Sequence, residues 1–219
     1  MKKFLLLFVL IALAAVLFGC TQNFPSVDMG KLSTPPAASI GSASAPIVVV
    51  EYSDYQCPLC RKWFLDSKKQ LFDEYVCTGK VRFEFKDFPL TNNHPLASMY
   101  ASALRCAGEQ IKYWEMHDKV YSGQDKLAGG SITIVTDVTA GDVASWAEEI
   151  GLNKSAFNEC LVSGKFDSEI SANESEGVSI GIDGTPSFVI AKATSSTGEL
   201  IAGAQPYSVF KAKIEEMLK

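Results

Sequence analysis

The hydrophobic and polar positions of this chain follow two periodicities, one typical of strands and one of helices. Residues 47–52 are a continuous apolar run rich in β-branched side chains, which predicts a fully buried strand. Residues 61–75 set aromatic and aliphatic side chains among lysines and acids, as in an amphipathic helix. Residues 80–85 alternate strictly, with the apolar residues on one side and Arg82, Glu84 and then Lys86 on the other, which predicts a half-exposed strand. A strand, a helix and a strand in this order predict a right-handed crossover between parallel strands.

The pattern becomes helical from residue 91 to about residue 176. Three stretches carry apolar side chains at helical spacing: 94–121, 142–150 and 154–162. Residues 132–135 are the one candidate for a short strand in this block. The last part of the chain again carries strand patterns and then an amphipathic helix, at 187–191, 199–202 and 208–218. We therefore expect an α/β fold interrupted by a helical insertion.

The N-terminus has the pattern of a secretory leader. Lys2 and Lys3 precede an apolar stretch over residues 4–19, and Cys20 follows directly. Residues 17–20 resemble the lipobox of bacterial lipoproteins, in which the cysteine becomes lipidated, although Phe18 departs from the small residue preferred there. We expect a leader over 1–19 with a lipid anchor at Cys20; an uncleaved anchor and plain secretion are the alternatives.

Composition agrees with an exported domain behind this leader. The 219 residues are 47% hydrophobic, enough to bury one good core. Without the two leader lysines the chain has 18 basic and 25 acidic residues, a net charge of -7, so nothing points to nucleic acid. Residues 20–45 are rich in Ser, Ala, Pro and Thr, which predicts a flexible tether.

A dithiol lies between the first predicted strand and helix, in the sequence Cys57-Pro58-Leu59-Cys60. Proline is tolerated in the first turn of a helix, so both cysteines are expected at a helix N-terminus, where the helix end stabilises a thiolate. Cys57 is then the nucleophile, and Cys60 the buried resolving thiol. A C-x-x-C pair is also half of a zinc site, but no second pair follows, and we expect no metal.

Four separated motifs resemble the DsbA-like proteins with a thioredoxin fold: residues 48–60, Lys86–Leu90 with His94, Cys106–Gln110 and Gly184–Phe188. The resemblance implies a thioredoxin-like domain over 46–90 and 177–219, a helical insertion over 91–176, and thiol–disulfide oxidoreductase activity. It further implies that Thr185-Pro186 is a cis-proline loop, packed against the dithiol and offering its backbone to a substrate peptide. We add Pro58 and Leu59 to the predicted substrate contacts; Leu59 replaces the histidine of the strongest oxidants of the family.

The remaining candidates for chemistry are acids and histidines. Glu51 ends a buried strand shortly before Cys57, and we weigh a role as proton carrier for Cys60 against a glutamate that reaches solvent. His94 is expected in a capping or surface position, and His117 on a solvated helix face. We expect the pKa of Cys57 in the upper half of the roughly 3.5–7.5 range known for such sites.

Three cysteines remain after Cys20 and the dithiol. Cys106 and Cys160 fall in two segments of the helical insertion, and we predict a structural disulfide between them. Cys77 is then unpaired and expected to be a small buried hydrophobic residue, although the sequence leaves its pairing with either partner open.

These observations predict an exported, membrane-anchored oxidoreductase that introduces disulfides into other exported proteins. It is expected at the outer face of the cell membrane, as a monomer, without a metal or organic cofactor. By resemblance, a membrane reoxidase of the DsbB or vitamin K epoxide reductase-like type restores its disulfide. A reductase or isomerase, and a binding lipoprotein without turnover, are the alternatives.

Overall fold

One mixed sheet of six strands organises the fold, in the order β1-β6-β5-β3-β4-β2. A computed structural model describes residues 24–131, 133, 135–136 and 138–219, so the predicted leader and Cys20 lie outside the described residues. The strands are β1 (Ser26–Asp28), β2 (Ala38–Ile40), β3 (Ile47–Ser53), β4 (Val81–Asp87), β5 (Ser187–Lys192) and β6 (Thr197–Ala202). The helices are α1 (Pro58–Trp63), α2 (Lys69–Leu71), α3 (Ala97–Gly108), α4 (Tyr113–Leu127), α5 (Ala140–Glu149), α6 (Lys154–Ser163), α7 (Asp167–Ser179) and α8 (Tyr207–Met217).

Strand β3 lies at the centre of the sheet and explains the continuous apolar run. It pairs in parallel with β4, as predicted, and antiparallel with β5. Ile47 and Val49 pack against the helices on one face, while Val48 and Val50 belong to the core on the other. Because both faces are covered, every residue of β3 is buried.

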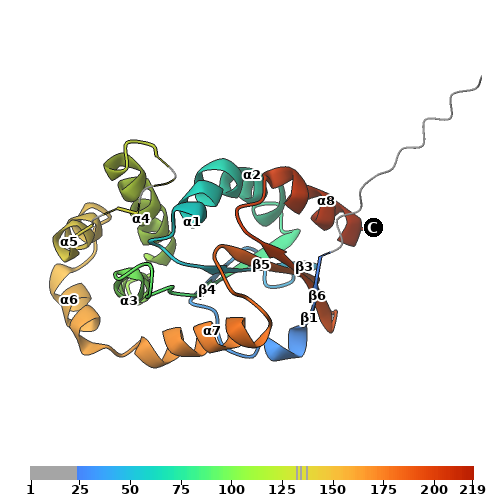
Figure 1. Cartoon of the computed structure of the whole chain (residues 1–219), viewed down its shortest axis with the longest axis horizontal. Helices are drawn as coiled ribbons and strands as arrows, with labels where there is room; N and C mark the ends of the chain where they lie inside the picture. The colour runs from blue at the N-terminus through green and yellow to red at the C-terminus, as the bar shows by residue number, and fades with distance from the viewer. Residues whose placement is uncertain (1–23, 132, 134, 137) are drawn as a thin grey trace, which may run out of the picture.

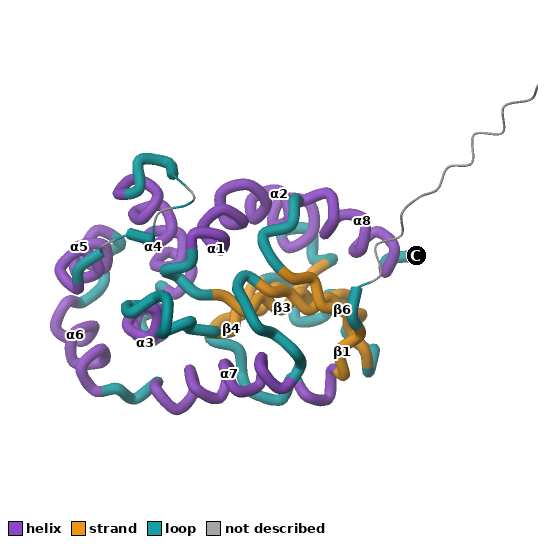
Figure 2. Tube along the Cα trace, in the orientation of Figure 1, coloured by secondary structure: helices purple, strands orange, loops and turns teal. Residues whose placement is uncertain are grey.

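The sheet is the middle of three layers (Figures 1 and 2). Helices α1, α2 and α8 cover one face, and α7 runs across the other. At Gly177 of α7 a Cβ atom would come within 2.7 Å of the Phe88 ring, so only glycine lets the helix approach the sheet this closely. The predicted domain boundary at residues 176 and 177 therefore falls inside a helix that belongs to the sheet's packing.

Helix α1 is the start of a longer helical rod. It continues through a π-helical turn (Phe64–Lys68), α2 and a second π-helical turn (Phe72–Val76). Trp63 and Leu71 on this rod are buried against the sheet, which accounts for the amphipathic pattern.

The N-terminal segment corrects one expectation from the sequence. Residues 24–45 are not a solvated tether, because β1 pairs with β6 and β2 pairs with β4 at the two edges of the sheet. Between these strands the Thr34 N–H donates to Glu176 Oε2 at 2.6 Å, and Lys86 Nζ donates to the Thr34 carbonyl at 2.7 Å. The segment is therefore part of the folded domain, although most of its side chains remain exposed or half-exposed.

Helices α3, α4, α5 and α6 form the insertion at one end of the sheet (Figure 1). A disulfide joins Cys106 of α3 to Cys160 of α6, with their Cα atoms 5.8 Å apart. Cys77 is a free thiol and exposed, contrary to the buried position expected for it. Of the short strand considered at 132–135, residues 132 and 134 lie outside the described residues.

Candidate active site

The dithiol occupies the N-terminus of α1, as predicted. Cys57 is the N-cap residue, with an extended backbone (φ -70°, ψ 122°), and Pro58 follows at the first helical position. Cys57 and Cys60 are free thiols, 6% and 0% exposed. Pro58 is half-buried, and the Leu59 side chain is 48% exposed beside the pair. The site therefore presents Cys57 at the edge of the core and keeps Cys60 inside it.

The loop before Cys57 is held by a buried carboxylate. Asp54 accepts hydrogen bonds from the Gln56 N–H at 2.7 Å, the Leu90 N–H at 2.9 Å and His94 Nδ1 at 2.6 Å. The expectation of a surface or capping role for His94 is thus wrong, because its ring is buried against Asp54. The hydrogen bond to Asp54 raises the pKa of His94, and a Cys57 thiolate raises it further.

The pKa values of the two thiols are shifted in opposite directions. The hydrogen bond from Cys60 lowers the pKa of Cys57 to about 6, against the effect of burial, with further donation from Thr185 and from backbone N–H groups at the helix start. Burial raises the pKa of Cys60, and the neighbouring Cys57 and Glu51 add to the effect. At neutral pH Cys57 is a thiolate and Cys60 a thiol, and this difference suits the nucleophile and the resolving thiol predicted from the sequence.

A cis peptide bond between Thr185 and Pro186 lies directly against the dithiol. The Thr185 carbonyl oxygen is 3.4 Å from Cys57 Sγ and accepts the S–H when Cys57 is protonated. The buried Thr185 Oγ1 has no hydrogen-bond partner among the described residues, and it is available to donate to the Cys57 thiolate, whose pKa Thr185 lowers. The Gly203 N–H donates to the Pro186 carbonyl at 2.8 Å and fixes this loop to the turn after β6.

Glu51 is buried beneath the dithiol, 1% exposed, so it is not a strand-end glutamate that reaches solvent. Its register partners on the neighbouring strands are Phe85 and Phe188, and its Oε2 has no hydrogen-bond partner among the described residues. Burial raises the pKa of Glu51 to about 8, although a hydrogen bond from Ser53 and the charge of Lys68 oppose the rise. The carboxyl is therefore mostly protonated at neutral pH.

Arg61 is a cation near Cys57 that was not singled out from the sequence. Its guanidinium is buried and donates to the Ser131 carbonyl at 2.6 Å. Burial lowers the pKa of Arg61, and the Cys57 thiolate opposes that change. Arg61 lies four residues after Cys57, one helical turn away, and this spacing could have indicated from the sequence that it lies near the dithiol.

The expectation of a solvated His117 is also wrong. Its ring is 1% exposed and packs against the rings of Tyr55, Phe85 and Tyr121. Burial lowers the pKa of His117 to about 4, so the ring is neutral. The insertion contributes His117 and Tyr121 to this aromatic cluster, and a helical pattern taken alone does not reveal that they pack against Tyr55 and Phe85.

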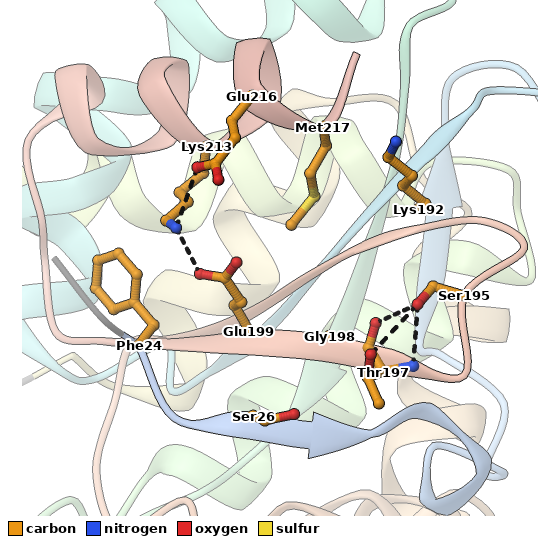
Figure 3. A pocket seen from close by; sticks show the side chains of 10 residues that line it. All are labelled: Phe24, Ser26, Lys192, Ser195, Thr197, Gly198, Glu199, Lys213, Glu216 and Met217. Atoms are coloured by element: carbon orange, nitrogen blue, oxygen red, sulfur yellow. Dashed lines mark hydrogen bonds and ion pairs between the residues drawn. The ribbon is translucent and has the colours of Figure 1, made fainter. Parts of the chain in front are cut away.

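Two hollows were not anticipated from the sequence. One of about 580 Å³ lies beside α1, between Lys62, Trp63 and Asp66 on one side and residues 204–208 on the other. A second of about 550 Å³, far from the dithiol, lies among β1, β6 and α8, where Lys213 pairs with Glu199 and Glu216 (Figure 3). Within the described part of the chain, no three His, Cys, Asp or Glu residues cluster as a metal site. None of the helices in that part has the length and apolarity needed to cross a membrane.

The family model described as Thioredoxin matches residues 33–216. The chain therefore belongs to this thioredoxin family, and its architecture is the DsbA-type thioredoxin fold with a helical insertion. The crystal structure of oxidised BdbD from Bacillus subtilis superposes with a TM-score of 0.71 at 20% identity, over 89% of this chain and 97% of that one.

The curated relatives are of two kinds, a disulfide bond formation protein and an antiporter. Disulfide bond formation protein D of Bacillus subtilis is 23% identical over 199 residues, 91% of this chain and 85% of that protein. The Na(+)/H(+) antiporter NhaA 3 of Salinispora tropica is 32% identical over 154 residues, 68% of this chain. The match spans only 21% of that antiporter.

Proposed function

We propose that this chain is a protein thiol–disulfide oxidoreductase that introduces disulfides into exported proteins. The observation that carries the proposal is the Cys57–Cys60 pair itself: a helix-capping thiol with its pKa lowered to about 6, against a buried partner whose pKa is raised. This asymmetry stabilises the reduced pair with one proton removed, and a stabilised reduced form makes the disulfide oxidising. The similarity to a disulfide bond formation protein supports the same reaction.

The reaction needs no electron carrier besides the two sulfurs. In the oxidised protein a substrate thiolate attacks Cys57 Sγ; the Cys57–Cys60 bond breaks and Cys60 leaves as a thiolate. A second substrate thiolate then attacks the substrate sulfur of the mixed disulfide, and Cys57 leaves as a thiolate. The substrate loses two electrons and forms its disulfide, and the pair gains those two electrons.

Glu51 is the proposed proton carrier for Cys60. The leaving Cys60 thiolate is a strong base because burial raises its pKa, and a proton from the neutral Glu51 carboxyl converts it to a thiol and moves the negative charge to the Glu51 carboxylate. During reoxidation the proton moves the other way, from the Cys60 thiol to the Glu51 carboxylate. A carboxyl with a pKa of about 8 serves both directions near neutral pH.

We assign substrate contact to the surface around Thr185, Pro186, Pro58 and Leu59. The exposed Leu59 offers apolar contact next to Cys57. The hollow of about 580 Å³ beside α1 extends this surface, because its residue Gln205 follows the turn that is bonded to Pro186. An extended peptide lying here would bring its own cysteine to Cys57.

Export and membrane attachment are part of the proposal. The leader pattern at residues 1–19 and the lipobox-like Cys20 support attachment to the outer face of the cell membrane. A membrane protein of the DsbB or vitamin K epoxide reductase-like type would reoxidise the pair. Labelling of intact cells with a radioactive fatty acid should mark the parent chain and not Cys20→Ala; equal labelling would contradict the lipid anchor.

The reduction potential of the pair tests the direction of the reaction. Equilibration of the purified protein with glutathione buffers should give a value near or above about -150 mV for an oxidase. A value near about -250 mV or lower would identify a reductase instead.

Two cysteine variants test whether the protein turns over at all. Cys57→Ser should abolish oxidation of a reduced substrate protein, and Cys60→Ala should accumulate mixed disulfides with exported proteins. Cys77→Ser is the control, because that exposed thiol lies outside the site. A Cys57→Ser protein that still supports function in the cell would favour the binding lipoprotein over the enzyme.

A further inference from the structure

Three buried polar side chains lie in a row beneath the dithiol: Tyr121 of the insertion, Ser53 and Glu51. Ser53 lies two residues after Glu51 on β3, so both side chains point to the same face of the sheet. The Ser53 hydroxyl acts on the Glu51 carboxyl from this shared face and lowers its pKa. The Ser53 Oγ also lies 3.1 Å from the hydroxyl oxygen of Tyr121, which comes from α4 of the insertion. Ser53 and Tyr121 are 2% and 1% exposed.

The other surroundings of Glu51 offer few hydrogen bonds. The sheet supplies two phenylalanine neighbours, Phe85 and Phe188. The charged or titratable groups that face the carboxyl are Cys60 on α1, Lys68 on the following π-helical turn, and Tyr113 and Tyr121 on α4. The Tyr113 hydroxyl lies 3.0 Å from that of Tyr55, and Lys68 pairs with Asp118. Tyr113 and Lys68 are thus engaged elsewhere, and Ser53 is the residue that brings a hydroxyl to the Glu51 carboxyl.

A pair of hydroxyls suits a carboxyl that gains and loses a proton. Each hydroxyl has one donor and two acceptor positions and rotates freely about its C–O bond. When Glu51 is ionised, Tyr121 donates to Ser53 and Ser53 donates to the carboxylate. When Glu51 is protonated, the carboxyl O–H donates to Ser53 and the direction of these hydrogen bonds reverses. The buried carboxyl therefore keeps a hydrogen bond to Ser53 whether it is ionised or protonated.

We propose that Ser53 and Tyr121 are positioning residues, through which the helical insertion holds Glu51 ready to exchange its proton with Cys60 in both protonation states. The inference rests on the proposed function, since it gives the carboxyl its task. It makes the insertion part of the proton path as well as a cover for the site. No proton leaves the row: one proton moves between Cys60 Sγ and Glu51, and the hydroxyls only reorient.

The test is Tyr121→Phe in the full-length protein, which removes the hydroxyl and keeps the ring in its aromatic cluster. The readout is the titration of the Glu51 side-chain carbon by NMR in the reduced protein, assigned with Glu51→Gln. Loss of a supporting hydrogen bond should raise the carboxyl midpoint by about half to one pH unit. The pH at which attack by Cys60 on a mixed disulfide reaches half its maximal rate should rise with it.

Tyr113→Phe is the matched control. It removes a buried hydroxyl from the same helix, but that hydroxyl bonds Tyr55 and not Ser53. Its carboxyl midpoint should equal that of the parent. An unchanged midpoint in Tyr121→Phe, or equal shifts in both variants, would overturn the proposal.

Ser53→Ala keeps the proposal testable if Tyr121→Phe does not fold. It removes the direct donor and should raise the midpoint further, by about one to two pH units. A midpoint unchanged in Ser53→Ala would equally overturn the proposal. A protein whose midpoints shift as expected but which exchanges no disulfides would instead disprove the proposed function, and leave the placement of Glu51 intact.

Discussion

The two faces of the central sheet each hold a buried glutamate, and the two carboxyls differ in how they are paired. Glu51 has an oxygen without a partner among the described residues, and burial raises its pKa to about 8. Burial also acts to raise the pKa of Glu176. Hydrogen bonds from Lys86, Tyr52 and the Thr34 N–H outweigh burial, and the pKa of Glu176 is lowered. The fully paired carboxylate joins three segments of the chain, whereas the poorly paired one is left able to carry a proton.

The largest expected effect comes from unpairing Glu176. Lys86→Met should lower the free energy of unfolding by about 3–5 kcal/mol, because it leaves a buried carboxylate without its counter-charge. Lys69→Met is the control: its ion pair with Asp73 is exposed to solvent, so its loss should change the free energy of unfolding far less. Urea unfolding of both variants measures the difference. Equal losses would show that Glu176 is no more dependent on its partner than a surface carboxylate.

Glu51→Gln should act in the opposite direction. The pKa of Glu51 is raised on folding, so the folded protein holds a proton that the unfolded chain has lost between about pH 4.5 and pH 8. The parent should therefore lose stability as pH rises through this window, and the variant should lose less. Urea unfolding at pH 8 should find the variant more stable by roughly 2–4 kcal/mol. Parallel pH dependences would contradict a neutral Glu51.

Tyr52→Phe sharpens the comparison with a single hydrogen bond. The Tyr52 hydroxyl donates to Glu176 Oε1 at 2.6 Å inside the core. Its loss should cost about 1.5–3 kcal/mol, as for other bonds to charged groups. Tyr75→Phe removes a similar bond to the more exposed Glu215 and should cost less. Thermal unfolding compares the two, and a larger loss in Tyr75→Phe would count against the role of burial.

The smallest effect is expected at Cys57 when Glu51 is changed. The ultraviolet absorbance of the thiolate should titrate with a midpoint of about pH 6, the thiolate being present above it. Because the charge of Glu51 acts on Cys60, Glu51→Gln should move this midpoint by less than about 0.5 pH unit. A larger movement would place Glu51 next to the nucleophile instead.

Local patterns sufficed for the parts of the molecule that depend on near neighbours. The apolar run at 47–52, the strand at 80–85 and Pro58 after Cys57 fix β3, β4 and the dithiol at a helix start. Strand periodicity nevertheless failed at Lys86, expected on the half-exposed side of β4 but buried against Glu176. The alternation shows which side of the sheet a residue faces, but not what covers that side.

The sequence by itself determined the α/β order of the chain, the helical insertion, and a dithiol poised to form a reactive thiolate. Only the tertiary structure decided that residues 24–45 complete the sheet, that His94 locks the loop through Asp54, and that Tyr121 reaches Ser53. The physical reason is distance along the chain. Propensity and periodicity act over a few residues, whereas a buried polar group takes its partner from whichever distant element the packing brings beside it.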